Sequence, residues 1–311
     1  MHRGNRHGKD SGGGGAIGLL FVLMLVLRSP AGLTAEPADL ERGAYLFAVG
    51  GCAGCHTDAA HGGALLAGGR ELKTPFGTFY GPNITPDPEH GIGRWSDADF
   101  VRALREGVAP NGSNYYPVFP YAAFTRMSDA DMLAIKAHIF SLPPVAQANR
   151  RHDVPFPLSW RFLLEFWKAL NFTPGAFQPN PGRSAEWSRG AYLSEAVAHC
   201  AECHTPRDWF GGLERSRAYS GTRTGPEGAK VPNITPDRET GIGGWSRAQV
   251  VRVLKTGLLP DGDVIGSLMG EVVQRSTSRL SDADREAIAI YLESLPPIAN
   301  PRAKAVSAPS E

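Results

Sequence analysis

The chain has little net charge. Its 311 residues include 32 Lys and Arg against 31 Asp and Glu, which gives a formal charge of +1. Residues 1–35 hold four basic side chains and one acidic side chain, so the remaining body carries about −2. A near-neutral body lacks the basic surface that binds a phosphate backbone. The composition therefore predicts no nucleic-acid partner.

Long hydrophobic runs are also missing. The longest apolar run, Ala16–Leu27, is short for crossing a bilayer and typical of the apolar part of an export signal. Leu33-Thr34-Ala35 then offers a small-residue cleavage site. An uncleaved membrane anchor is the alternative, because tilt or local thinning accommodates a short span. Either interpretation places the protein body in the periplasm, free or attached to the outer face of the inner membrane.

Cysteine is scarce, and the four residues present would usually form two disulfides in an exported protein. All four instead lie in two C-x-x-C-H motifs, at 52–56 and 200–204. Cysteines three residues apart lie on the same side of a helical turn, where both sulfurs can bond the vinyl groups of one porphyrin. A thioredoxin-like pair does not require the following histidine, and a zinc site would need a second pair of ligands.

The motifs therefore predict two covalently attached haem c groups, each with the histidine of its motif as an iron ligand. The attachment residues are Cys52, Cys55, Cys200 and Cys203, and the iron ligands are His56 and His204.

The two motifs head an internal duplication. Six segments recur in the same order with an offset of about 150 residues, which chance matches of short peptides do not produce. The pairs are RGAYL at 42–46 and 189–193, CAGCHT and CAECHT at 52–57 and 200–205, PNITPD at 82–87 and 232–237, GIGRWS and GIGGWS at 91–96 and 241–246, SDAD at 128–131 and 281–284, and SLPP at 141–144 and 294–297.

Each half is predicted to be mostly α-helical, because no series of alternating strands is visible. One helix leads into the haem motif, at 37–51 and 184–199. A second begins at Ser96 and at Ser246, where a serine N-cap precedes an apolar stripe, and it ends near a glycine. A last helix begins at Ser128 and at Ser281 and is stopped by a Pro-Pro pair.

A methionine is the usual second axial ligand of such a haem. Met269 lies twelve residues after Gly257 and is predicted to be the ligand in the second half. Phe119 occupies the matching place in the first half, so Met127, just before the Ser128 cap, is predicted there. Met127 could instead be a packing residue at the helix start. Met132 belongs to the helix interior, and His61 and His90 are fallback ligands.

The haem propionates need hydrogen-bond donors or cations. Side chains of this kind occur at matching places in both halves, in or near the repeated segments. Those assigned to propionate contacts are Arg70, Asn83, Trp95, Arg223, Asn233 and Trp245. The alternative for the PNITPD segments is a rigid turn without a ligand.

The segment between the halves, residues 150–183, contains an aromatic stretch at 156–172. Trp160, Leu163, Leu164 and Trp167 fall on one face at helical spacing. The favoured prediction is a helix buried between the two haem modules. A helix that lies on a membrane or docks a partner is the alternative, because Trp and Phe beside Arg161 and Lys168 suit such a boundary.

The pattern of RGAYL, C-x-x-C-H, PNITPD, GIG-x-W-S, SDAD and SLPP resembles the periplasmic multihaem cytochromes c of bacterial dehydrogenases, including the cytochrome subunits of membrane-bound alcohol and gluconate dehydrogenases. Those usually carry three such modules, whereas this chain has two. Many relatives read Tyr-Pro-Ala-Met-Pro-Tyr where this chain has Tyr116–Tyr121 with Phe119.

The resemblance implies two tandem class I-like cytochrome c domains, at 36–149 and 184–298, followed by a disordered tail at 299–311. The expected function is electron transfer from a periplasmic dehydrogenase to an oxidase, a quinone or another cytochrome, with the protein setting the haem environment. A dihaem enzyme, such as a thiosulfate dehydrogenase or a peroxidase, is the alternative. A haem-based sensor would need an output domain, and the two modules leave no room for one.

Overall fold

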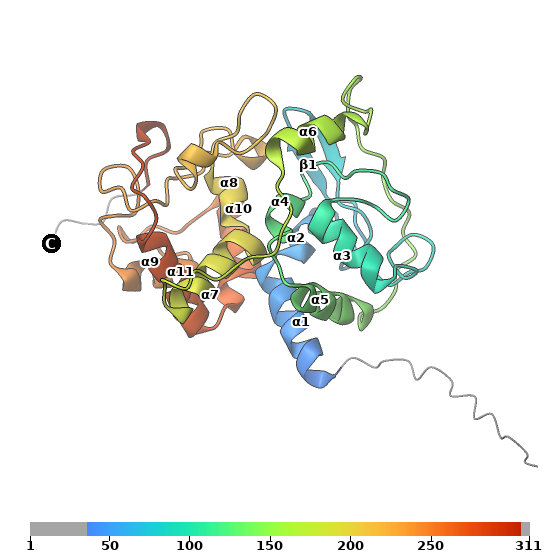
Figure 1. Cartoon of the computed structure of the whole chain (residues 1–311), viewed down its shortest axis with the longest axis horizontal. Coiled ribbons are helices and arrows are strands. Elements are labelled where there is room, and N and C mark those ends of the chain that lie inside the picture. Colours follow the sequence, from blue (N-terminus) through green and yellow to red (C-terminus); the bar gives the residue numbers. More distant parts are fainter. Residues whose placement is uncertain (1–35, 306–311) are drawn as a thin grey trace, which may run out of the picture. The chain divides into compact units, whose positions relative to one another are not determined.

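The computed structural model describes residues 36–305, so the predicted export signal lies outside the described part. Within that part the chain is mostly helical, as predicted, and Figure 1 shows both halves in one compact unit. No helix among residues 36–305 is long and apolar enough to cross a bilayer.

The first half contains the helices in the predicted order. They are α1 (Pro37–Val49), α2 (Cys52–His56), η1 (Ala59–His61), α3 (Asp97–Glu106), α4 (Tyr121–Phe124) and α5 (Asp129–Phe140). The sequence prediction missed a small antiparallel hairpin of β1 (Glu71–Thr74) and β2 (Gly77–Tyr80), in which Glu71 pairs with Tyr80. Strands of four residues are too short for their alternation to stand out from a loop.

The second half repeats this order. Its elements are α7 (Ala185–Tyr192), the π-helical η2 (Leu193–Val197), α8 (Cys200–His204), η3 (Arg215–Arg217), η4 (Pro226–Gly228), α9 (Arg247–Thr256), α10 (Ser267–Arg275), η5 (Thr277–Arg279), α11 (Asp282–Glu293) and η6 (Pro301–Ala303). Helix α6 (Leu163–Asn171) lies between the halves in sequence.

The predicted helix boundaries are confirmed where capping residues specify them. Ser96 and Ser246 accept hydrogen bonds from the backbone three residues on and form complete capping boxes. Gly107 and Gly257 end these helices in the left-handed conformation. Ser128 and Ser281 cap α5 and α11 in the same way.

Within each half, the first helix packs closely against the last. Gly43 of α1 lies so near α5 that a Cβ would overlap the backbone carbonyl of Ala134. Gly190 of α7 meets the carbonyl of Ala287 on α11 in the same manner. The glycine in each RGAYL segment therefore permits the close approach of two helices.

The two halves are joined by an exchange of tyrosines. In the first half, Arg42 pairs with the buried Asp131 at 2.6 Å, and Tyr192 of the second half donates to the same carboxylate. In the second half, Arg189 pairs with Asp284 at 2.7 Å, and Tyr45 of the first half donates to it at 2.5 Å. Each aspartate thus holds an arginine of its own repeat and a tyrosine of the other. This reciprocity ties the two halves together within one compact unit.

The prediction of a disordered tail is wrong for residues 299–305. Asn300 donates to the carbonyls of Ser220 and Gly221, and the carbonyl of Ala303 accepts from the backbone of Asn233. Ala303 and Ala305 are buried. The sequence of this segment, which is rich in alanine and proline, has no apolar periodicity that would predict order. Its backbone groups nevertheless form hydrogen bonds with the loop that follows the second haem motif.

The prediction of a buried linker helix is also wrong. α6 is shorter than the aromatic stretch, and Leu164 is its one fully buried residue. Phe166 and Leu170 are exposed on it, and Phe156, Trp160 and Phe162 are exposed before it. The helix lies along the surface, where Lys168 and Glu165 bind groups of the first half and Trp167 donates to the carbonyl of Phe210 in the second. Helical spacing of apolar residues predicts that a helix has an apolar face, but it does not predict whether another part of the protein buries that face.

We expect Gly43→Ala to destabilise the protein. The added methyl overlaps rigid backbone, and overpacking of this kind costs about 1–3 kcal/mol, against which the better helix propensity of alanine returns about 1 kcal/mol. Thermal unfolding of the haem-loaded protein should show a lower Tm. Gly244→Ala is the matched control, because a Cβ there meets nothing within 4 Å. An unchanged Tm for Gly43→Ala would show that α1 and α5 do not need the glycine.

Candidate functional site

Each C-x-x-C-H motif forms a helix of its own, α2 and α8. The residue before each helix is in the left-handed conformation, Gly51 with φ 64° and His199 with φ 41°. This sharp turn separates the motif from the preceding helix. All four cysteines are unpaired, so their sulfurs are available for thioether bonds.

The two motif histidines are oriented by backbone carbonyls. Nδ1 of His56 lies 2.8 Å from the carbonyl oxygen of Pro82, and Nδ1 of His204 lies 2.9 Å from that of Pro232. A proton on Nδ1 that is donated to this carbonyl leaves Nε2 free as an iron ligand. Burial lowers the pKa of both histidines and favours the neutral, ligating form. The PNITPD segments thus orient the predicted proximal ligands, a role that sequence reasoning did not assign to them.

The cysteine surroundings fit a porphyrin. Burial raises the pKa of Cys52 and of Cys200 to about 12, so both remain thiols in the absence of a bound group. Burial also raises the pKa of Cys55, although this residue has exposed surface. Two thiols one helical turn apart, beside a histidine whose Nε2 is free, suit a covalently bound haem, which supplies one-electron iron chemistry when attached.

The two motifs approach each other. Nε2 of His199, next to Cys200, lies 3.3 Å from the carbonyl oxygen of Gly50, two residues before Cys52. Arg70 donates to the carbonyl of Gly54 inside the first motif and pairs with Glu271 of the second half. The arrangement therefore ties the first predicted haem-attachment motif to the second half of the chain.

Comparison with known proteins agrees with this geometry. The family model for cytochrome c matches residues 40–143. A dihaem cytochrome c-type protein of Cereibacter sphaeroides is 44% identical over 272 residues, which cover 86% of this chain and 88% of that protein. The chain is a member of the cytochrome c family. It carries two haem c groups.

Further relatives are subunits of larger enzymes. The cytochrome c subunit of the quinone-dependent alcohol dehydrogenase of Gluconacetobacter polyoxogenes is 41% identical, with 85% of this chain and 57% of that subunit covered. The gluconate 2-dehydrogenase cytochrome c subunit of Pantoea cypripedii is 39% identical, with 89% and 64% covered. The cytochrome thus spans little more than half the length of these dehydrogenase subunits.

The predicted ligand Met127 is deeply buried. It is 1% exposed and lies in the turn between α4 and the Ser128 cap, packed in the core with Phe124. Arg105 fixes this turn, because its guanidinium donates to the carbonyls of Thr125 and Met127 and pairs with Asp129. Sequence reasoning did not predict this role of Arg105, because no motif or repeated segment marks the residue.

The predicted ligand Met269 has a different setting. It lies on helix α10 and not on a loop, and it is half-buried. Leu280 stands before the Ser281 cap, at the place that Met127 has in the first half, and it is buried. The two halves of this cytochrome therefore offer their methionines from different positions.

The structure gives Asn83 and Asn233 another role than the predicted propionate contact. Asn83 donates both amide hydrogens to backbone carbonyls, those of Val145 and Gln147. Asn233 donates to Thr240 and to the carbonyl of Ile298. With no donor left, each asparagine ties the PNITPD loop to the segment after the last helix.

The predicted propionate arginines also differ from expectation. Arg70 donates to the carbonyl of Gly54 inside the first motif at 2.8 Å and pairs with Glu271 of the second half at 2.5 Å. Arg223 is exposed, and Arg207 takes the corresponding place, because it donates to the carbonyl of Glu202 inside the second motif at 3.0 Å. Sequence reasoning missed Arg207, since its distance from the motif differs from that of Arg70.

The two predicted tryptophans are half-buried. Trp95 and Trp245 both pack against the core of the cytochrome.

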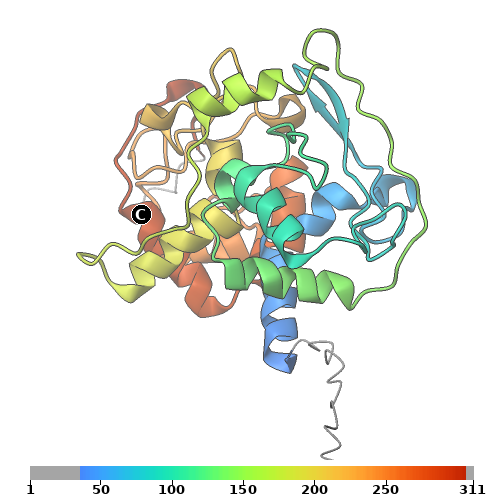
Figure 2. The same ribbon diagram turned by 45° about the vertical axis from the view of Figure 1, so that its right-hand side comes forward.

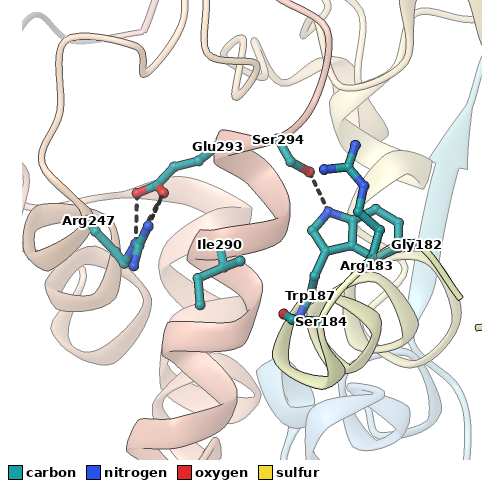
Figure 3. Close-up of a pocket in the computed structure, with 8 residues that line it drawn as sticks. All are labelled: Gly182, Arg183, Ser184, Trp187, Arg247, Ile290, Glu293 and Ser294. Carbon is teal, nitrogen blue, oxygen red and sulfur yellow. Dashed lines mark hydrogen bonds and ion pairs between the residues drawn. The ribbon is translucent and has the colours of Figure 1, made fainter. Parts of the chain in front are cut away.

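A surface recess of about 420 Å³ lies apart from the motifs, between α7 and α11 (Figure 3). Trp187 donates to Ser294 at 2.6 Å on one side, and Arg247 pairs with Glu293 at 2.6 Å on the other. None of the predicted haem residues lines this recess.

We expect Met127→Leu and Met269→Leu each to lower one haem midpoint potential by about 0.1 V or more, within the roughly 0.8 V that axial ligands span. Leucine keeps the volume of methionine but cannot bind iron. Spectroelectrochemical titration measures both potentials. Met132→Leu, in the buried interior of α5, is the control and should leave both unchanged. Unaltered potentials in Met127→Leu would remove Met127 as a ligand.

Proposed function

We propose that this cytochrome accepts electrons from a periplasmic dehydrogenase and passes them through its two haems to the respiratory chain. The observation that carries the proposal is the approach of the two haem motifs, with His199 reaching the carbonyl of Gly50. Two attachment motifs whose flanking residues touch suit a relay, since electron tunnelling weakens steeply with distance. Several relatives are cytochrome subunits of alcohol, gluconate or fructose dehydrogenases, which supports a dehydrogenase as donor.

The residues around each haem are proposed to keep it closed to substrates. His56 and His204 supply one axial ligand, and Met127 and Met269 supply the other, so neither iron offers a free position for catalysis. A dihaem enzyme such as a peroxidase or thiosulfate dehydrogenase needs one open position. The apolar run at 16–27 supports export to the periplasm, with or without a retained membrane anchor.

The donor is proposed to dock on an aromatic surface beside the second motif. We assign to this surface the exposed apolar side chains on and before α6 and those after the second motif, because Phe156 contacts Trp160, Trp160 contacts Phe162, and Trp167 of α6 donates to the carbonyl of Phe210. The assigned side chains are Phe156, Leu158, Trp160, Phe162, Phe166, Leu170, Trp209 and Phe210. Trp209 is 96% exposed and follows His204 by five residues. Large aromatic side chains dominate the binding energy of protein interfaces, and apolar surface is typical of lasting complexes.

Helix α6 lies at the upper end of both views, and helix α1 starts at the lower end (Figures 1 and 2).

We expect substrate-dependent haem reduction by membranes of a strain that lacks this cytochrome, once the purified protein is added back. The substrates to test are a simple alcohol such as ethanol, gluconate, fructose and nicotinate, because relatives belong to dehydrogenases named for an alcohol, gluconate, fructose or nicotinate. Absorption spectroscopy follows the reduction and shows whether both haems are low spin. A high-spin haem that binds added cyanide or peroxide would contradict a pure carrier and support the enzyme.

We expect the double variant Phe166→Ser, Trp209→Ser to slow this reduction at least several-fold without a change in Tm, because both side chains are exposed. The control is Val264→Ser, an exposed apolar residue outside the aromatic surface. Binding of the wild type to phosphatidylglycerol vesicles, lost in the double variant while reduction by the donor is unchanged, would assign the surface to a membrane.

A further inference from the structure

His199 is the residue directly before the second haem motif, and its backbone is strained. Its φ of 41° lies in the left-handed region that side chains other than glycine seldom adopt. The corresponding residue of the first half is Gly51, with φ 64°, so the same turn is made there by glycine. A histidine that keeps an unfavourable conformation suggests that its side chain has a use.

The side chain of His199 reaches into the first half. Its Nε2 lies 3.3 Å from the carbonyl oxygen of Gly50, and its ring meets the ring of Phe124 edge-on, with centroids 5.4 Å apart. Burial lowers the pKa of His199, so the ring is neutral and its Nε2–H can donate to the carbonyl. Since Gly51 has no side chain, the duplication has no second contact of this kind.

The carbonyl that His199 contacts belongs to the approach to the first motif. A Cβ on Gly50 would lie 3.6 Å from Sγ of Cys52 and 3.6 Å from the carbonyl oxygen of Val197 in the second half. Ser276 of the second half donates to the neighbouring carbonyl of Val49 at 2.6 Å. The residues just before Cys52 are therefore held by the second half at two successive carbonyls.

We propose that His199 is a positioning residue that bridges the two haem motifs and controls one-electron transfer between the two haems. The bridge runs by covalent bonds from Cys200 to His199, by one hydrogen bond to Gly50, and by covalent bonds to Cys52. One iron is oxidised from Fe(II) to Fe(III), the other is reduced from Fe(III) to Fe(II), and no bond or proton is exchanged. Electrons tunnel better along bonds than across a gap, and the bridge also fixes the separation of the motifs.

This inference rests on the proposed relay function. A second connection between the first motif and the second half does not include His199, because Arg70 donates to the carbonyl of Gly54 and pairs with Glu271. Removal of the His199 side chain therefore tests the bridge and leaves the other connection in place.

The test compares His199→Gly, which installs the residue of the first half, with His199→Gln, whose amide nitrogen can replace Nε2 as the donor. Exchange NMR of haem methyl signals in the half-reduced, fully loaded protein measures the interhaem rate, and spectroelectrochemical titration measures both potentials. His138→Gln is the control, because His138 is a half-buried histidine whose ring packs against Phe47 of α1, away from the contact with Gly50.

We expect His199→Gly to slow interhaem exchange several-fold, with rescue in His199→Gln and wild-type exchange in His138→Gln. Glycine relieves the strained turn, so a merely structural role would leave exchange unchanged. Wild-type exchange in His199→Gly, or equal losses in the glycine and glutamine variants, would overturn the bridge. An absence of exchange in the wild-type protein would instead contradict the relay itself.

Discussion

The structure depends on two carboxylates that each serve both halves. Asp131 and Asp284 are buried, and each binds the arginine of its own repeat and the tyrosine of the other. Burial raises the pKa of Asp284, but the hydrogen bonds from Arg189 and Tyr45 outweigh it and hold the value below the ordinary range. The arginine supplies the charge that balances each carboxylate, so its loss would leave a buried charge uncompensated.

The exchange follows directly from duplication. RGAYL carries both the arginine and the tyrosine, and SDAD carries the aspartate, so two copies are complementary to each other as identical subunits are in a symmetric dimer. The aspartate of each SDAD segment therefore binds RGAYL residues of both repeats, the arginine within its own repeat and the tyrosine from the other. This explains why these two segments, which contain no haem residue, recur as faithfully as the C-x-x-C-H motifs.

The features that could be predicted from the sequence are those specified by residues close together in the chain. Serine caps, terminal glycines and the spacing of Cys and His each act within a few residues, and the helices and attachment motifs appear where these signals place them. Long-range partners were not predictable. Arg70 meets Glu271 across 201 residues, and nothing near either residue indicates the other. The PNITPD segment was recognised as important, but its contribution to the histidine is a backbone carbonyl, which every residue has.

Some differences between the halves lie at the predicted haem sites, whereas the caps of the helices are shared. Gly51 is replaced by His199, and Met127 is replaced by Leu280, whereas the caps and the glycine crossings are unchanged. Two haems in identical surroundings would have similar potentials and little preference for the direction of transfer. Contacts from the other half reach the approach to each motif, at Gly50 and through Arg126 and Glu195. Each haem environment is therefore a product of both repeats, and the direction of transfer depends on how the two copies have diverged at their shared boundary.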